Sequence, residues 1–242
     1  MTTYFISDLH LSPSTHEITT HFINFLNNEA KHADALYILG DLFEFWIGDD
    51  DKSPFAVQIR TSLKELVNQG IPCYFTKGNR DFLVGEAFAK QTGMHLLGDE
   101  TVIDLYGRKA IILHGDTLCT RDVDYLAFRA KVHQPWLQWC FNHLPYSIRK
   151  KIVAKVQAGA KEGKQYKAMD IMDVTEDEVT KVMNHYDVDL MIHGHTHRPN
   201  VHKMDNGKTR IVLGDWYHQS SVLSFSASGY KLTNNSFHAE EQ

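Results

Sequence analysis

Near its start the chain reads Thr3-Tyr4-Phe5-Ile6-Ser7-Asp8-Leu9-His10, an apolar run that stops at an aspartate and a histidine. Runs of the same kind follow along the chain, at 35–39, 73–76, 109–113 and 189–192. Continuous apolar character bounded by glycine or charge is typical of strands that are covered on both faces. These runs therefore predict the strands of a layered α/β domain.

Between and after these runs the periodicity changes. Apolar residues recur at helical spacing in 18–26 and 55–66, so helices are expected there. Thr175 followed by Glu178 is a capping box and predicts the start of another helix. Asp205-Asn206-Gly207 predicts a hairpin, with further strand-like sequence behind it. We therefore expect an α/β domain that ends in antiparallel strands.

Each predicted strand ends at a short motif of possible metal ligands. The motifs are Asp8-Leu9-His10, Gly40-Asp41, Gly78-Asn79-Arg80-Asp81, His114-Gly115-Asp116 and Gly194-His195-Thr196-His197. Because ligands bind at the carboxyl ends of strands in open α/β sheets, the motifs can converge on one crevice. Carboxylate, imidazole and amide groups without a thiolate favour manganese, with zinc or iron as alternatives. Seven such ligands are too many for one tetrahedral ion and suit two ions about 4 Å apart.

Length and composition are those of one globular domain. The chain has 242 residues, of which 43% are hydrophobic and 23% charged. Neither a signal peptide nor an apolar run of about 18 residues is visible. The three cysteines are odd in number and lack metal-site spacing, which indicates a reduced, cytosolic chain.

The segment at about 121–168 departs from the α/β rhythm. It predicts two or three helices without a strand, and we interpret it as a helical cap inserted into a single domain of residues 1–242, with ordinary packing helices as the alternative. From Arg121 to Lys167 there are ten Lys and Arg against three Asp and Glu, a net charge of +7. The whole chain carries −5, so the remainder carries −12. A basic segment on an acidic protein indicates a locally anionic partner.

Aromatic and basic side chains alternate within this segment. Trp136, Trp139 and Tyr146 lie close in sequence to Arg149 and Lys150. Such a face can lie on an anionic bilayer while apolar residues bury acyl chains. A solvated outer face explains the individual lysines equally well. No recognised nucleic-acid motif is present, so nucleic acid is not expected as a partner.

The motifs together carry a family resemblance. The stretches that carry it are Asp8-Leu9-His10-Leu11, Gly40-Asp41-Leu42-Phe43-Glu44-Phe45-Trp46, Gly78-Asn79-Arg80-Asp81-Phe82 and His114-Gly115-Asp116. From Asp8 to His197 the sequence resembles the calcineurin-like metallophosphoesterases, most closely the bacterial UDP-2,3-diacylglucosamine hydrolases of lipid A synthesis. The resemblance implies a four-layer αββα sandwich with two central sheets.

The resemblance also implies roles for individual residues. One metal would be bound by Asp8, His10, Asp41 and His197, and the other by Asp41, Asn79, His114 and His195. Catalytic roles are implied for Asp41, Asn79, Arg80 and His195, with Asn79 and His195 touching the phosphate. Substrate contacts are implied for Asn79, Arg80, Asp122, Ala160, Lys164, Lys167 and His195, and acyl-chain contacts for Phe82, Tyr125 and Phe128.

Arg80 departs from many relatives, which place a histidine after the Gly-Asn pair. Arginine does not release its proton, so it cannot protonate an alkoxide leaving group. It can bind phosphate bidentately and stabilise its charge. A phosphate leaving group, whose second pKa is about 6, needs no protonation. Arg80 therefore favours cleavage of an anhydride over a simple ester, unless it only pairs with Asp81 or Asp122.

The expected activity is hydrolysis of UDP-2,3-diacylglucosamine to UMP and 2,3-diacylglucosamine 1-phosphate by water activated between two metals. The resemblance thus implies a lipid-linked nucleotide sugar as substrate, and a cytoplasmic protein peripheral to the bacterial inner membrane. The alternatives are another dinuclear enzyme, such as a nucleotide phosphodiesterase or phosphoprotein phosphatase, and a non-catalytic scaffold. All seven ligands are retained, which counts against the scaffold. No oligomeric state follows from the sequence.

Overall fold

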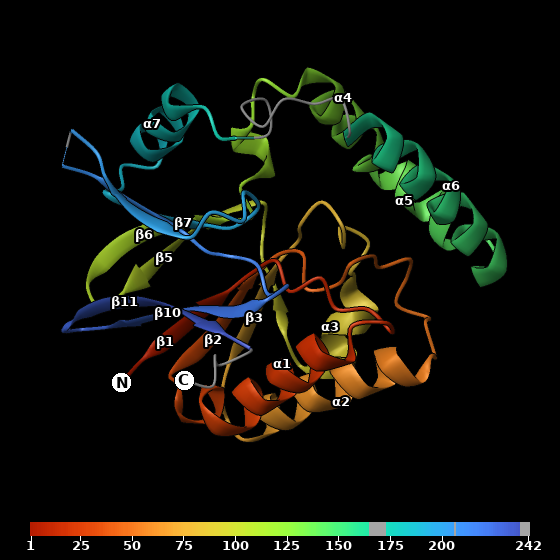
Figure 1. The fold of residues 1–242 in the computed structure, drawn as a ribbon, viewed down its shortest axis with the longest axis horizontal. Helices are drawn as coiled ribbons and strands as arrows, with labels where there is room; N and C mark the ends of the chain where they lie inside the picture. Colours follow the sequence, from red (N-terminus) through yellow and green to blue (C-terminus); the bar gives the residue numbers. More distant parts are fainter. Residues whose placement is uncertain (165–172, 206, 238–242) are drawn as a thin grey trace.

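The computed structural model describes residues 1–164, 173–205 and 207–237, and its centre is formed by two sheets (Figure 1). The six-stranded sheet has the order β11-β10-β1-β2-β3-β4, with bounds Gly229–Ser236, Gln219–Ser226, Thr3–Ile6, Ala35–Leu39, Cys73–Thr76 and His95–Leu96. The five-stranded sheet has the order β5-β6-β7-β9-β8, with bounds Glu100–Leu105, Arg108–Leu113, Leu190–His193, Thr209–Val212 and Asn200–Lys203.

Helices cover the outer faces of both sheets. The six-stranded sheet is covered by α1 (His16–Asn28), α2 (Pro54–Asn68) and α3 (Glu86–Thr92), and the five-stranded sheet by α7 (Glu176–His185) (Figure 1). Single turns of 3-10 helix occur at Ala30–His32 and Asp116–Leu118. The expected four-layer αββα sandwich is confirmed.

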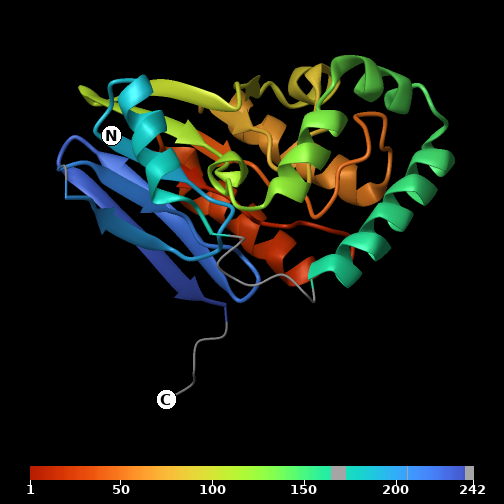
Figure 2. The same ribbon diagram turned by 90° about the horizontal axis from the view of Figure 1, so that it is seen from above.

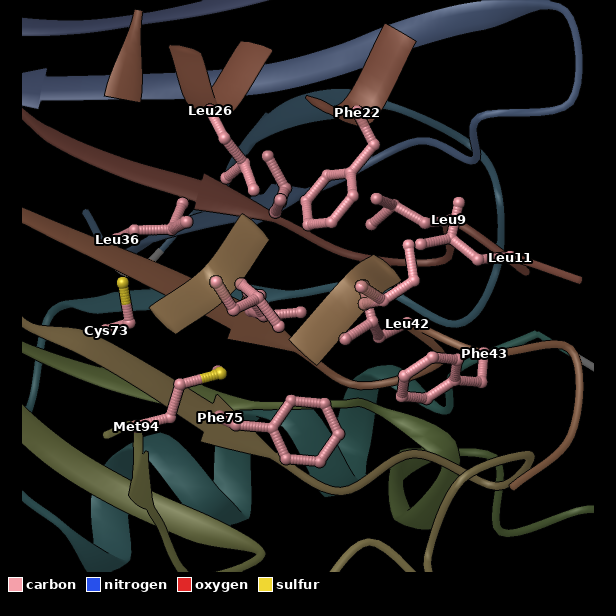
Figure 3. Packing of buried hydrophobic residues seen from close by; sticks show 14 of the residues in the cluster. Leu9, Leu11, Phe22, Leu26, Leu36, Leu42, Phe43, Cys73, Phe75 and Met94 are labelled. Atoms are coloured by element: carbon pink, nitrogen blue, oxygen red, sulfur yellow. The ribbon is translucent and has the colours of Figure 1, made fainter. Parts of the chain in front are cut away.

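Three hydrophobic clusters fill the three interfaces between the layers. Neighbouring strand residues point to opposite faces, so Ile6 packs with Phe22 under α1 while Phe5 packs between the sheets. In the same way Ile112 faces the other sheet and Ile111 faces α7. Figure 3 shows the cluster beneath α1 and α2, where Phe22, Leu26, Leu36 and Phe75 come together from helices and strands. Strands buried on both faces account for the continuous apolar runs in the sequence.

All five predicted strands are present, as β1, β2, β3, β6 and β7. The pairs β1–β2, β2–β3 and β6–β7 are parallel, which brings the carboxyl ends of the strands to one edge of each sheet. The hairpin is also confirmed, since β8 and β9 are antiparallel with Lys203 opposite Thr209. The predicted capping box is wrong, because the side chain of Thr175 makes no hydrogen bond to the backbone at the start of α7. Thr175 is the N-cap residue of α7, but its hydroxyl lies 2.7 Å from that of Thr120 instead of capping the helix.

Among the described residues, three further helices lie between the 3-10 turn at Asp116–Leu118 and α7. They are α4 (Val123–Val132), α5 (Pro135–Asn142) and α6 (Tyr146–Lys164), and they extend to one side of the sandwich (Figures 1 and 2). Thr175 N donates to Leu118 O at 2.9 Å, so the chain returns from these helices beside the point where it left. Within the described ranges, no helix combines the length and the apolar character needed to cross a membrane.

Candidate metal centre

The loops that follow β1, β2, β3, β6 and β7 bring the predicted ligands together. Asp8, Asp41 and His114 are buried, and each comes within two residues of the end of its strand. Two clusters of ligand atoms form, each with all atoms within 4.8 Å of one another. They are Asp8, His10 and His197, and Asp8, Asp41 and His114. Asp8 belongs to both, so the two clusters adjoin.

The first cluster joins the ends of β1 and β7. His10 Nε2 lies 3.3 Å from His197 Nε2, and His197 Nε2 lies 3.4 Å from Asp8 Oδ1. Asp41 Oδ2 lies 3.9 Å from His10 Nε2. These four residues form the first of the two ligand sets implied by the family resemblance.

The second set gathers around Asn79. Its side-chain oxygen lies 3.0 Å from His114 Nε2 and 3.0 Å from His195 Nδ1. Asp41 Oδ1 lies 3.7 Å from His114 Nε2. The two oxygens of Asp41 therefore face different histidines, His10 on one side and His114 on the other. This is the geometry that a bridging carboxylate requires.

The second ring nitrogen of three histidines lies close to an oxygen atom, although His10 Nδ1 makes no hydrogen bond to it. His10 Nδ1 lies 3.0 Å from Glu44 Oε2, and His197 Nδ1 lies 3.1 Å from Asp215 Oδ2. His114 Nδ1 lies 2.9 Å from the carbonyl oxygen of Leu39. Acceptors behind a histidine orient the ring and leave Nε2 for a metal. Neither carboxylate was predicted from the sequence. Glu44 stands inside the motif that runs from Gly40 to Trp46, whereas Asp215 follows the last motif and no pattern marks it.

The chemistry of this site fits divalent cations. Asp8 Oδ1 is buried and has no hydrogen-bond partner among the described residues. Burial by itself lowers the pKa of a histidine, but the carboxylates of Asp41, Asp8 and Asp116 raise the pKa of His114 to about 9. Burial of His197 is likewise outweighed by Asp215 and Asp8, which raise its pKa to about 10. The site thus attracts positive charge, and its oxygen and nitrogen donors suit manganese, iron or zinc.

The ligand loops have an unusual backbone. Positive φ angles occur at Asp8, His10, Asp41, His195 and His197, five of the seven non-glycine residues with positive φ among those described. This region is sterically disfavoured for residues with a Cβ, and such strain persists only where the surrounding structure enforces it. The ligand directions are therefore set by the packed loops.

Two glycines make room for the carboxylates. A Cβ on Gly78 would lie 2.2 Å from Asp41 Oδ1, and a Cβ on Gly194 would lie 2.2 Å from Asp8 Oδ2. Both positions accept only glycine, because a Cβ at either one would overlap a carboxylate oxygen.

Arg80 lies beside the second ligand set. Its backbone N–H donates to Asp41 Oδ1 at 2.8 Å, and its guanidinium carbon lies 5.0 Å from the centre of the Phe45 ring. Asp81 does not pair with Arg80, because its buried carboxylate accepts hydrogen bonds from the backbone of the ligand loops. Contact with an aromatic face restrains the guanidinium and leaves its N–H groups for a ligand.

A cavity of about 700 Å³ opens next to Asn79 and Arg80. The three side chains predicted as acyl-chain contacts line it, namely Phe82, Tyr125 and Phe128, and α5 and α6 contribute further apolar residues such as Phe141 and Val153. Trp46 is buried in the core and also forms part of this wall. The cavity is thus an apolar chamber with polar groups at the end near the metal ligands.

The remaining predicted substrate contacts fall in different places. Asp122 lines the chamber, and its carboxylate also caps α4 by accepting from Tyr125 N at 3.1 Å. Ala160 and Lys164 belong to the part of α6 whose side chains are not described. Lys167 lies outside the described residues.

Comparison with known proteins agrees with this architecture. The family model for calcineurin-like phosphoesterases matches residues 1–199. UDP-2,3-diacylglucosamine hydrolase of Vibrio atlanticus (strain LGP32) is 64% identical over 240 residues, covering 98% of this chain and 98% of that protein. The enzyme of the same name from Aliivibrio fischeri (strain MJ11) is 57% identical over 240 residues, covering 98% of this chain and all of that protein. The solved structure of a novel archaeal phosphodiesterase covers 97% of this chain and 99% of its own, with 15% identity and a TM-score of 0.50, a likeness of fold.

Proposed function

This chain belongs to the calcineurin-like phosphoesterase family, and from that membership we propose that it hydrolyses the pyrophosphate bond of UDP-2,3-diacylglucosamine. The products are UMP and 2,3-diacylglucosamine 1-phosphate, and the reaction belongs to lipid A biosynthesis. One observation carries this function to the present chain. An apolar chamber of about 700 Å³ ends at Asn79 and Arg80, beside the predicted metal ligands. A substrate with acyl chains on one side of an anhydride matches such a site.

Two divalent cations, for which we propose manganese, would be held by the two ligand sets that share Asp41. When bound, they supply an activated water and neutralise charge on the phosphoryl oxygens. The residues of the chain position the anhydride. Asn79 offers an amide N–H to a phosphoryl oxygen, because its own oxygen faces the two histidines. We propose that His195, whose Nδ1 lies 3.0 Å from the side-chain oxygen of Asn79, contacts the same phosphoryl group.

Arg80 stabilises the phosphate that leaves. Its guanidinium is restrained on Phe45 and lines the chamber, so it can bind phosphoryl oxygens without first losing much side-chain freedom. The leaving group of an anhydride is a phosphate, which departs as an anion without a proton donor. The residues beside the anhydride therefore suit a phosphoanhydride better than a simple alkyl ester.

We further propose that α4, α5 and α6 act as a cap that rests on the cytoplasmic face of the bacterial inner membrane. Trp136 and Trp139 are 65% and 62% exposed on α5, and α6 adds half-exposed Ile148. Lys150 and Lys151 follow in α6. Exposed tryptophans next to lysines bind the boundary between headgroups and acyl chains of an anionic bilayer.

Flotation with vesicles tests the membrane contact. We expect the wild-type protein to float with phosphatidylglycerol vesicles and less with phosphatidylcholine vesicles. A Trp136→Ser, Trp139→Ser double variant should remain at the bottom of the gradient, while Val102→Ser, a matched loss of an exposed apolar side chain on β5, should float. Wild-type protein that stays entirely in the soluble fraction would contradict the membrane role alone.

The activity is tested by turnover with added manganese. UDP-2,3-diacylglucosamine is compared with UDP-glucose and para-nitrophenyl phosphate, with Asp41→Ala as the control. We expect release of UMP from the acylated substrate that depends on Asp41. Faster turnover of para-nitrophenyl phosphate would overturn the lipid substrate and leave only a dinuclear phosphoesterase.

A further inference from the structure

A buried carboxylate next to the metal centre holds the first helix of the chamber wall. Asp116 ends the His114-Gly115-Asp116 motif and is 3% exposed. Its Oδ2 accepts a hydrogen bond from the Tyr125 hydroxyl and another from Arg129 Nε at 2.7 Å. One carboxylate oxygen two residues from His114 thus binds two side chains of α4.

These two side chains come from successive turns of the same helix face. Tyr125 and Arg129 are four residues apart, so both point from α4 toward Asp116. Arg129 also donates to Asp99 Oδ2 at 2.8 Å. The guanidinium therefore bridges the loop after β6 and the residue just before β5. Two points of attachment fix both the position and the rotation of α4.

The same helix carries part of the chamber wall. Tyr125, Phe128 and Val132 line the chamber, whereas Asp116 and Arg129 do not. The Tyr125 ring centre also lies 6.4 Å from that of His195. The contacts of Asp116 thus set the distance between the apolar wall and the metal ligands.

The opposite wall has a separate attachment. Arg149 of α6 is 1% exposed and donates to Ile47 O at 2.7 Å and to Asp50. Both acceptors lie in the connection between β2 and α2, beyond Asp41, and neither contacts Asp116. Removing the attachment of α4 would therefore shift one wall of the chamber while the other stays in place.

We propose that Asp116 and Arg129, acting with the Tyr125 hydroxyl, are positioning residues that fix the acyl chamber in register with the metal centre. This inference rests on the proposed function. Acyl chains bound in the chamber orient the anhydride only if the wall keeps its place relative to His114 and His195. A displacement of about 1 Å is enough to cost about 100-fold in rate. The effect must grow with acyl-chain length, because longer chains make more contact with the wall.

The experiment measures kcat and KM for substrates that carry butanoyl, octanoyl or myristoyl chains. The variants are Arg129→Met, which removes both hydrogen bonds, Arg129→Lys, which keeps the charge, and Tyr125→Phe, which removes one hydroxyl. Arg108→Met is the matched control. Arg108 lies on β6, its Nε is 3.1 Å from Asp189 Oδ1, and it does not line the chamber. Manganese binding is measured for every variant.

We expect Arg129→Met to lower kcat/KM about 30-fold for the myristoyl substrate and less than about threefold for the butanoyl one, mainly through kcat. Arg129→Lys should recover part of that loss, and Tyr125→Phe should lose about threefold on the myristoyl substrate with its fold intact. Manganese affinity should stay within about twofold in all variants, because Arg129 and Tyr125 hydrogen-bond to Asp116 and Asp99 and to none of the predicted ligands.

Equal losses at every chain length, or weaker manganese binding, would overturn the inference, since they would mean that Arg129 only supports the His114 loop or the fold. If Arg129→Met does not fold, Tyr125→Phe decides by the same comparison. Wild-type protein that turns over none of the three substrates would overturn the proposed function and this inference with it. Normal wild-type turnover with losses independent of chain length overturns this inference alone.

Discussion

The carboxylate of Asp81 lies behind Asp41 and accepts its backbone N–H at 3.2 Å. The same carboxylate accepts from Gly78 N at 2.9 Å and from Leu42 N at 2.7 Å. It therefore ties the loop after β2, which carries Asp41, to the loop after β3, which carries Asn79. Asp81 is fully buried, so these backbone groups have no water to replace it.

Asp81→Asn should weaken metal binding without removing a ligand. The side-chain NH₂ of the new asparagine would face backbone N–H groups, and two donors cannot form a hydrogen bond. The loop that carries Asp41 would then lose part of its attachment to Asp81. We expect manganese affinity to fall by about 10-fold to 100-fold, the range seen when residues behind metal ligands are changed. Calorimetric titration with manganese measures this fall. An unchanged affinity would show that Asp81 supports the fold and not the ligands.

Gly78→Ala should abolish activity through a direct clash. The added Cβ would lie 2.2 Å from Asp41 Oδ1, so the carboxylate between His10 and His114 must move. We expect a loss of more than about 100-fold in kcat. Gly98→Ala is the control, because its Cβ would meet nothing closer than Glu100 O at 3.6 Å. If Gly78→Ala were nearly as active as the control, Asp41 would not need its place between His10 and His114 for activity.

Removal of metal should destabilise the wild-type protein but not Asp41→Ala. Ligands that bind only the folded state stabilise it by mass action, about 2.7 kcal/mol at a free concentration of 100 times Kd. Thermal unfolding with and without manganese measures the gain. Asp41 is buried close to Asp8, so its loss also relieves repulsion between carboxylates in the metal-free protein. Equal gains in both proteins would show that Asp41 is not a ligand.

Arg80→His should change the preference for the leaving group. A histidine can donate a proton to an alkoxide, whereas the arginine only stabilises the charge of a phosphate. We expect kcat for the anhydride to fall by about 10-fold, and turnover of an alkyl phosphodiester to rise relative to it. The ratio of the two rates is the measurement. A ratio equal to that of the wild-type protein would remove Arg80 from the choice of substrate.

His133 should make the protein less stable in mild acid. Burial, together with the positive charges of Arg129 and Lys77, lowers its pKa below the ordinary 6.5, against the opposite effect of Asp99 and Asp116. The unfolded chain therefore binds more protons below pH 6.5 than the folded protein does. The contribution of His133 to the free energy of unfolding is therefore fully present above that pH. It is lost as the pH falls from there toward the lowered pKa of the folded protein.

His133→Gln should remove part of this decline. Thermal unfolding midpoints at pH 7.5 and 5.5 are compared for the variant, the wild-type protein and His32→Gln, which changes an exposed histidine. We expect a smaller drop between the two pH values in His133→Gln only. The ring of His133 lies 5.1 Å from that of Phe82, so loss of this stacking lowers both midpoints together and leaves their difference as the test.

Much of the candidate site could be predicted because it is encoded locally. A ligand that directly follows a buried strand is visible as a polar residue after an apolar run, and parallel pairing carries Asp8, Asp41 and Asn79 to one edge. Strands with a solvated face lack that signal. Strand β5 has exposed and half-exposed residues up to Leu105, so no apolar run marked it. The capping box failed for a related reason, since Thr175 found a tertiary partner in Thr120.

The amino-acid sequence by itself determined the layers of the fold and which side chains meet at the metal centre. Only the tertiary structure decided how those side chains are oriented and held. Asp215 lies behind His197, Asp81 behind Asp41 and Asp116 beneath α4, and in each case the contact joins separate loops or elements. Positive φ angles at Asp8 and Asp41 are likewise imposed by packed loops. Contacts between separate elements leave no periodicity in the sequence, because their energy depends on distances that exist only after the layers have packed.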